Sequence, residues 1–208
     1  MGLLNLLLKD PLGFFIIAIP LLYAVIFHEL AHGWVAYRMG DPTAKSLGRL
    51  SLNPLKHLDP VGTLMLFIFG FGWAKPVPVN FNRLRDRHLG MILVSAAGII
   101  TNMLLAFFAL FLYQLLSLPP AGLSSQLLYY FARINIILAA FNLIPLPPLD
   151  GSKILMGFAS AGVRNFLFRF ERYGFFIIIA LLYLGVLTPV IRFFEWMIIS
   201  LIRLMLVN

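Results

Sequence analysis

The chain alternates long apolar stretches with short polar connections along its whole length. Three of these stretches reach the roughly 20 residues that a transmembrane helix needs, and two shorter ones follow near the C-terminus. The stretches are residues 12–37, 89–116, 126–146, 174–187 and 190–207. This pattern predicts an all-α polytopic membrane protein with about five to six transmembrane helices, and counting the stretches gives five crossings.

One further apolar stretch, residues 61–73, is too short to cross a bilayer comfortably. Basic residues flank it on both sides, so we expect it to enter the membrane and return on the same side, as a re-entrant segment. The segment that follows, Lys75–Asn80, alternates proline with valine. Because proline disfavours helix in the residue before it, this segment is predicted to be extended and β-like.

The composition also indicates a membrane protein. The chain is 61% hydrophobic and 12% charged, whereas a soluble domain keeps about a quarter of its residues charged. Cysteine is absent, so a bound metal would be held by imidazole, carboxylate or carbonyl groups. The formal net charge is +8, but the basic residues lie between the apolar stretches. That placement fits the positive-inside rule better than it fits nucleic-acid binding.

The positions of the basic residues predict the orientation. Twelve of the sixteen lie in three connections, which the positive-inside rule assigns to the cytoplasmic side. They are Arg38, Lys45, Arg49, Lys56, Lys75, Arg83, Arg85, Arg87, Lys153, Arg164, Arg169 and Arg172. The uncharged connection Ser117–Ser125 then lies outside, as does the N-terminus, and the C-terminus lies inside. We expect a multi-pass protein of a prokaryotic plasma membrane.

The first apolar stretch carries the sequence His28-Glu29-Leu30-Ala31-His32. Two histidines four residues apart lie on one face of a helix and can bind the same zinc ion, and the glutamate between them can polarise a water molecule. Ionisable groups are costly within a membrane span, which favours a functional interpretation. The alternative is a pair of buried histidines that bond to the backbone or to each other. Counting back from Arg38, both histidines lie roughly 9–15 Å below the cytoplasmic boundary.

A catalytic zinc site needs a third protein ligand. Of the five aspartates, Asp150 is the one at the cytoplasmic end of an apolar stretch, at a depth comparable with the histidines. Prolines at positions 145, 147 and 148 end the preceding helix, and Gly151 relieves crowding. Asp150 is therefore a candidate ligand. The alternative is an N-cap for a helix that starts at Ser152.

Three stretches together resemble the site-2 protease family of intramembrane metalloproteases. They are HELAH at 28–32, GWAKPVPVN at 72–80 and FNLIPLPPLDG at 141–151. The resemblance implies one zinc ion per chain bound by His28, His32 and Asp150, with Glu29 as the general base. It implies hydrolysis of peptide bonds of transmembrane substrate proteins in or near the membrane plane, on the cytoplasmic side. It also matches Asn142 to a family asparagine that steadies the scissile carbonyl.

The resemblance covers roughly residues 12–155, which we take as the catalytic core of a single domain, 1–208, with a C-terminal helical hairpin at about 171–207. One departure is Ile99, where the family often has proline, so a kink there is not expected. Gly98, Asn102 and Ala106 still form a small-residue stripe for close helix packing. The short Ser117–Ser125 connection leaves no room for a PDZ domain, so the chain looks like a minimal member.

The extended segment suggests how a substrate is held. Pro76 and Pro78 lack N–H groups, while Val77 and Val79 keep theirs, so a substrate strand could pair along Lys75–Asn80. The alternative is an edge whose prolines discourage aggregation.

Four other polar residues receive weaker predictions. Asn135 faces either the active-site cavity or a neighbouring helix, and Arg133 is expected to snorkel or to pair with a carboxylate. His57 and His88 are expected to be solvated and not to bind metal.

Three other functions compete with intramembrane proteolysis. An ion or proton transporter could use the same cluster of His28, Glu29, His32 and Asp150, although the chain shows no internal repeat. A pseudoprotease could bind transmembrane helices without cutting them, but the intact Glu29 argues against it. A membrane-anchored surface protease is disfavoured because the HELAH sequence lies inside an apolar stretch.

Overall fold

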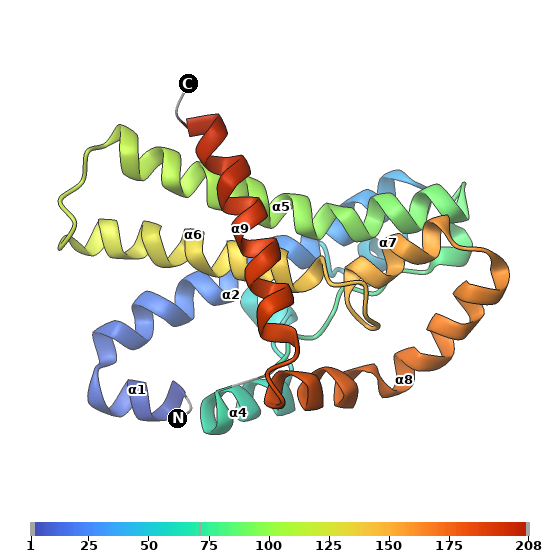
Figure 1. The fold of residues 1–208 in the computed structure, drawn as a ribbon, viewed down its shortest axis with the longest axis horizontal. Coiled ribbons are helices and arrows are strands. Elements are labelled where there is room, and N and C mark those ends of the chain that lie inside the picture. Colours follow the sequence, from blue (N-terminus) through green and yellow to red (C-terminus); the bar gives the residue numbers. More distant parts are fainter. Residues whose placement is uncertain (1–2, 71, 207–208) are drawn as a thin grey trace.

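The computed structural model describes residues 3–70 and 72–206, and every regular element within them is helical, as predicted. The α-helices are α1 Leu3–Lys9, α2 Pro11–Arg38, α3 Thr43–Ser46, α4 Pro60–Phe69, α5 Arg87–Leu115, α6 Leu123–Asn142, α7 Asp150–Phe158, α8 Ala161–Tyr183 and α9 Leu187–Leu206. Two short 3-10 turns, η1 Pro54–Lys56 and η2 Phe81–Arg83, lie in the connections. Figure 1 shows α5 and α6 side by side, with α9 crossing them.

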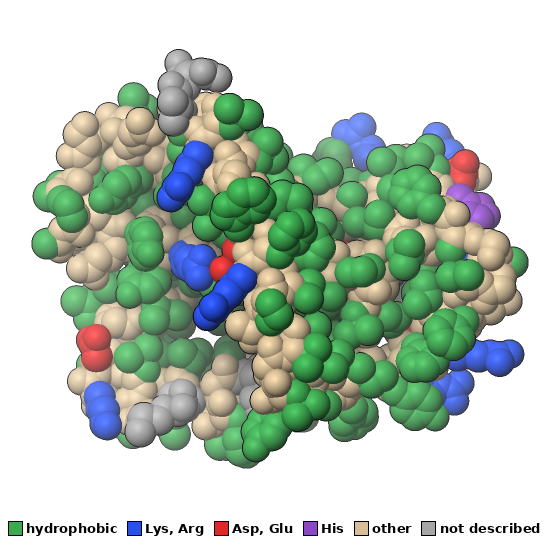
Figure 2. All heavy atoms as spheres, viewed as in Figure 1, with side chains coloured by type: hydrophobic (Ala, Val, Ile, Leu, Met, Phe, Trp, Pro, Cys, Tyr) green, Lys and Arg blue, Asp and Glu red, His purple; other side chains and the backbone are tan. Residues whose placement is uncertain are grey.

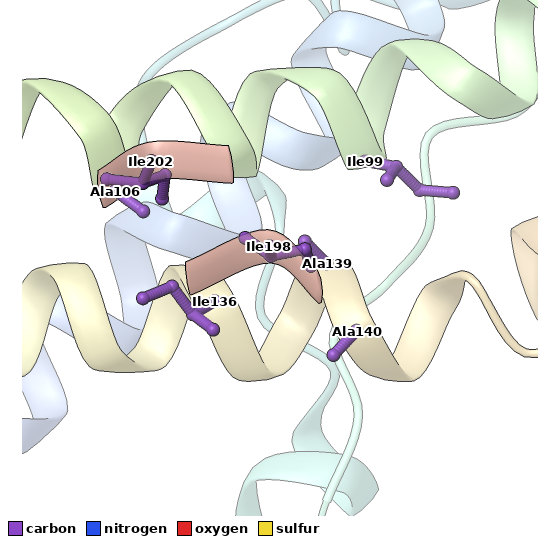
Figure 3. Packing of buried hydrophobic residues seen from close by; sticks show 7 residues of the cluster. All are labelled: Ile99, Ala106, Ile136, Ala139, Ala140, Ile198 and Ile202. Atoms are coloured by element: carbon purple, nitrogen blue, oxygen red, sulfur yellow. The ribbon is translucent and has the colours of Figure 1, made fainter. Parts of the chain in front are cut away.

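The core forms where α5, α6 and α9 meet. Its buried residues, drawn in Figure 3, are Ile99, Ala106, Ile136, Ala139, Ala140, Ile198 and Ile202. Three of the seven are alanines, which let the helix backbones approach closely. Because lipid is as apolar as these side chains, close van der Waals packing is what holds such helices together in a bilayer.

Within residues 3–70 and 72–206, two helices, α2 and α5, are long and apolar enough to cross a membrane, and α8 with α9 makes a third candidate if the bent pair counts as one span. This is fewer than the five to six predicted crossings. Helix α6, one of the predicted crossings, packs against both α2 and α5 but is not apolar enough to count as a candidate span. Its polar residues Gln126, Arg133 and Asn135 lower its hydropathy. Hydrophobic side chains dominate the face shown in Figure 2, consistent with a multi-pass membrane protein.

The predicted re-entrant segment forms the short helix α4, and the chain after it runs back alongside the helix. Helix α4 ends at Gly70, whose φ of 79° lies in the left-handed region that glycine adopts readily. The chain then returns along α4, since a Cβ on Gly62 would lie 2.1 Å from the carbonyl oxygen of Trp73. Phe71, which follows Gly70 in the sequence, lies outside the described residues.

The β-like part of the prediction is wrong for the described residues. Lys75–Asn80 is extended but joins no strand, and one isolated bridge links Leu58 to Ala74. The prolines explain this result, because they remove two of the N–H groups that a sheet would use.

The C-terminal region also differs from the predicted hairpin at 171–207, whose last residue lies outside the described residues. Helices α8 and α9 meet at 90° rather than antiparallel. The break falls at Leu184–Val186, where Gly185 has a φ of 74°, and not at Thr188-Pro189. Pro189 instead lies in the first turn of α9, where a missing N–H costs little.

Candidate metal centre

The two histidines of α2 lie one turn apart and point the same way. Their Nε2 atoms are 2.9 Å apart, and the rings meet edge to face. Both side chains are buried, with exposed fractions of 7% for His28 and 8% for His32. The helical spacing that the sequence predicted therefore brings the two ring nitrogens to one point.

Asp150 completes the cluster from the start of α7. Its Oδ2 lies 3.1 Å from the Nε2 atom of each histidine. Asp150 is the first residue of α7, and neither it nor Leu149, the N-cap, makes a side-chain capping bond. The N-cap interpretation of Asp150 is therefore wrong. The loop before it is held tightly, since a Cβ on Gly151 would lie 2.4 Å from the Leu143 carbonyl oxygen.

The hydrogen bonds on the far sides of the two rings decide where their protons lie. His32 Nδ1 lies 2.7 Å from the carbonyl oxygen of Val94, which can only accept, so this nitrogen donates. His28 Nδ1 lies 2.6 Å from Oδ1 of Asn102 and donates likewise. In the neutral rings both Nε2 atoms then carry lone pairs. A metal-binding histidine usually has this arrangement, with its other N–H donated to a fixed acceptor.

With both rings neutral, the three converging atoms, His28 Nε2, His32 Nε2 and Asp150 Oδ2, are all acceptors. Asp150 Oδ2 is buried and has no hydrogen-bond partner, and the nearest cation, Lys153 Nζ, lies 3.9 Å from the other carboxylate oxygen. Lone pairs placed this close repel one another unless a cation lies among them. His28, His32 and Asp150 form the one group of three or more potential ligands found in the described residues. Two imidazoles and a carboxylate are a donor set that suits zinc.

Helix α5 leaves room beside this cluster at Gly98. A Cβ built there would lie 2.5 Å from His32 Nε2 and 2.6 Å from His28 Cε1. Any side chain at this position would enter the space next to the two histidine rings. Gly98 therefore does more than allow α2 and α5 to pack closely.

Glu29 is half-buried next to the histidines and is held by the extended segment. The Val77 N–H donates to Glu29 Oε2 at 2.7 Å, and the Val77 side chain is buried against α2. A Cβ on Gly33, one turn further along α2, would lie 2.7 Å from Val77 Cγ1. The segment predicted to receive substrate therefore lies directly against the candidate general base.

Asn142, the other predicted catalytic residue, is the last residue of α6. Its Nδ2 donates to the Leu138 carbonyl at 3.0 Å, which satisfies a donor within its own helix. The hydrogen bond of Asn142 Nδ2 thus stays within α6 and does not involve the histidines or Asp150. Its role in steadying a carbonyl stays a prediction.

The weaker predictions have mixed outcomes. Arg133 pairs with Glu195 of α9 at 3.4 Å, which confirms pairing with a carboxylate. Asn135 bonds Asn102 of α5, which confirms the helix–helix alternative. His88 is exposed, as predicted. The solvated position of His57 is wrong, because the connection before it folds over the ring and His57 is fully buried against the Ser51 carbonyl, 2.7 Å from its Nε2.

Sequence reasoning missed the roles of Asn102, Val94 and Val77 around the cluster. Asn102 and Gly98 had been assigned to helix packing alone. Their spacing of four residues places both on one face of α5, and this was the signal that could have connected them with His28 and His32.

Comparison with known proteins agrees with this geometry. The family model described as "Peptidase family M50" matches residues 117–185. "Putative zinc metalloprotease YwhC" of Bacillus subtilis is 42% identical over 187 residues, covering 86% of this chain and 84% of the relative. Rip2 of Mycolicibacterium smegmatis, named in the same terms, is 29% identical over 194 residues, 88% of this chain and 72% of the relative. No solved structure matches. The chain belongs to peptidase family M50, the site-2 protease family of intramembrane zinc metalloproteases.

Proposed function

We propose that His28, His32 and Asp150 hold one zinc ion per chain and that the protein uses it to cleave transmembrane proteins. The observation that carries this proposal is the convergence of three buried ligand atoms, His28 Nε2, His32 Nε2 and Asp150 Oδ2, within 3.1 Å of one another. A zinc ion there supplies Lewis acidity, which polarises a peptide carbonyl and lowers the pKa of water toward about 7.

Glu29 is the general base in this proposal. It follows His28 directly on α2, and its Oε2 is fixed by the Val77 N–H at 2.7 Å. The carboxylate takes a proton from the attacking water and passes it to the leaving amine nitrogen. Asn142 acts at the scissile carbonyl, where an amide N–H would stabilise developing negative charge.

The reaction takes place near the cytoplasmic side of a prokaryotic plasma membrane. The C-terminal end of α2, the N-terminal end of α5 and the C-terminal end of α7 lie together, and the connections there carry most of the basic residues. The positive-inside rule favours the cytoplasm for this end. The uncharged connection between α5 and α6 lies at the opposite end of these helices (Figure 1).

Substrates pair as an extended strand along Lys75–Asn80. Peptide bonds in a transmembrane helix are hidden in its own hydrogen bonds, so cleavage requires local unwinding, and a fixed edge can hold the unwound chain. The Val77 N–H already donates to Glu29, so a substrate carbonyl that pairs there must replace the carboxylate. A substitution at Val77 would disturb Glu29 as well as strand pairing. Val79 is therefore the better position for a test, because its N–H is not bonded to the general base.

Replacing Val79 with proline removes that donor, whereas Val79→Ala keeps it and shortens the side chain. We expect the proline variant to cleave a transmembrane substrate more slowly and the alanine variant to cleave it at close to the wild-type rate. Equal rates for the two variants would exclude strand pairing at Val79.

The function itself is tested by measuring zinc content and substrate cleavage for wild type and Glu29→Gln. We expect about one zinc per chain in both proteins, with cleavage lost in the variant. Wild-type protein that binds no zinc, or a Glu29→Gln variant that still cleaves, would contradict the proposal. Zinc binding without cleavage in wild type would favour a pseudoprotease, and proton or ion flux through reconstituted protein would favour a transporter.

A further inference from the structure

The hydrogen bonds behind His28 continue beyond Asn102 into a third helix. Asn102 Nδ2 donates to Asn135 Oδ1 at 2.8 Å, and Asn135 Nδ2 donates to the Phe131 carbonyl at 2.8 Å. Both asparagines are fully buried, with exposed fractions of 0%. The chain of bonds therefore runs from α2 through α5 to α6, and its bonds from His28 to Asn102 and from Asn102 to Asn135 are buried.

The direction of this chain is fixed at its far end. The Phe131 carbonyl can only accept, so Asn135 must present its NH2 group to it and its oxygen to Asn102. Asn102 must then present its own NH2 group to Asn135 and its oxygen to His28. Because that oxygen only accepts, His28 must donate a hydrogen bond from Nδ1–H. The lone pair of the neutral ring is then on Nε2. A backbone carbonyl on α6 thus determines which nitrogen of His28 faces the cluster.

We infer that Asn102 and Asn135 are positioning residues that hold His28 in its metal-binding tautomer; this rests on the metal site proposed above. Neither residue touches the cluster's three acceptor atoms in the described structure. Asn102 acts on His28 directly, and Asn135 acts by preventing the Asn102 amide from turning over. A reversed amide would offer NH2 to His28 Nδ1, and the ring proton would then move to Nε2, where it blocks metal binding.

Helix packing alone would give a different result. If the asparagines only join α5 to α6, leucine should be tolerated better than aspartate, because a buried carboxyl group is costly in a membrane protein. If they fix the tautomer, aspartate should be tolerated better. A carboxyl group at position 102 presents an oxygen to His28 whichever way it turns, and one at position 135 still presents an oxygen to Asn102.

The experiment measures zinc affinity of the full chain in detergent by competition with a chromophoric chelator. Loss of an outer hydrogen-bond partner weakens metal affinity by about 10–100-fold. We expect Asn102→Leu to show a loss in this range and Asn135→Leu a loss of about 10-fold. Asn102→Asp and Asn135→Asp should stay near wild type. Ser125→Ala, which removes a buried α6 hydroxyl bonded to the Pro119 carbonyl, is the matched control and should bind zinc normally.

Wild-type affinity in both leucine variants, or aspartate variants as weak as or weaker than the leucine variants, would overturn the inference. If the leucine variants do not fold, nitrogen-15 NMR of the His28 ring in zinc-free wild type replaces them. An unprotonated Nε2 and a protonated Nδ1 support the inference, and the opposite tautomer or a mixture contradicts it. If wild-type protein binds no zinc even at a saturating zinc concentration, the proposed metal site itself would be wrong.

Discussion

Gly98 lies on α5 at the point where a side chain would meet both histidines. A Cβ there would come within 2.5 Å of His32 Nε2, closer than two such atoms can lie without displacement. We predict that Gly98→Ala weakens zinc binding by at least about 10-fold, comparable with the loss of an outer-sphere partner. Cleavage should fall in proportion to the zinc that is lost. Zinc titration and a cleavage assay on the purified variant measure both quantities.

Gly162→Ala provides the control for this change. Gly162 lies in the first turn of α8, and a Cβ there meets nothing within 4 Å. We expect this variant to bind zinc and cleave like wild type, with unfolding free energy unchanged or raised by up to about 1 kcal/mol from the better helix propensity of alanine. If Gly98→Ala behaves in the same way, the space at Gly98 has no role in metal binding.

The sequence predicted the residues of the cluster well and their supports poorly. His28 and His32 share a helix face, so local spacing was enough to pair them, and Asp150 was identified from its position together with the family resemblance. The bond from His28 to Asn102 joins residues 74 positions apart, and the bond from Val77 to Glu29 joins residues 48 positions apart. No local periodicity predicts contacts of that kind.

At the level of elements, α8 supports the loop that carries Asp150. Gly174 of α8 lies so close to this loop that a Cβ would be 2.2 Å from the Pro147 carbonyl oxygen. We predict that Gly174→Ala shifts the loop and moves Asp150 away from the histidines. Zinc affinity should fall by at least about 10-fold while α2 and its histidines stay in place, and metal titration checks this.

Phe176→Ala, two residues further along α8, is a matched control, because the Phe176 side chain is 71% exposed. It should leave zinc affinity unchanged. Equal zinc affinity in Gly174→Ala and wild type would mean that the loop holds Asp150 without support from α8.

The elements themselves were predicted unevenly, for physical reasons. Helices α2 and α5 followed from uninterrupted apolar stretches, and the re-entrant course of α4 followed from its length and flanks. The 90° bend between α8 and α9 was not predicted, because it depends on Gly185 in a left-handed conformation rather than on the more conspicuous Thr188-Pro189. Glycine conformation at such a site is decided by packing, which hydrophobic periodicity does not report.

For the whole molecule, the polar centre lies in an apolar protein whose helices cannot use water to satisfy it. Most of the buried polar side chains near the centre are bonded to one another or to backbone, but Asp150 Oδ2 is not. An unpaired buried acceptor beside two lone pairs destabilises the metal-free fold. Metal binding and folding stability should therefore be coupled.

We predict that zinc raises the thermal stability of wild type and that a strong chelator removes this gain. At a free zinc concentration 100 times Kd, a single site contributes about 2.7 kcal/mol. In Asp150→Asn the amide can donate to a histidine Nε2, so the zinc-free variant should unfold at a higher temperature than zinc-free wild type and should respond little to zinc. Thermal unfolding in detergent, with zinc and with chelator, tests both statements. A zinc-free variant less stable than zinc-free wild type would show that Asp150 is stabilised without a cation, and the electrostatic argument for the metal would fail with it.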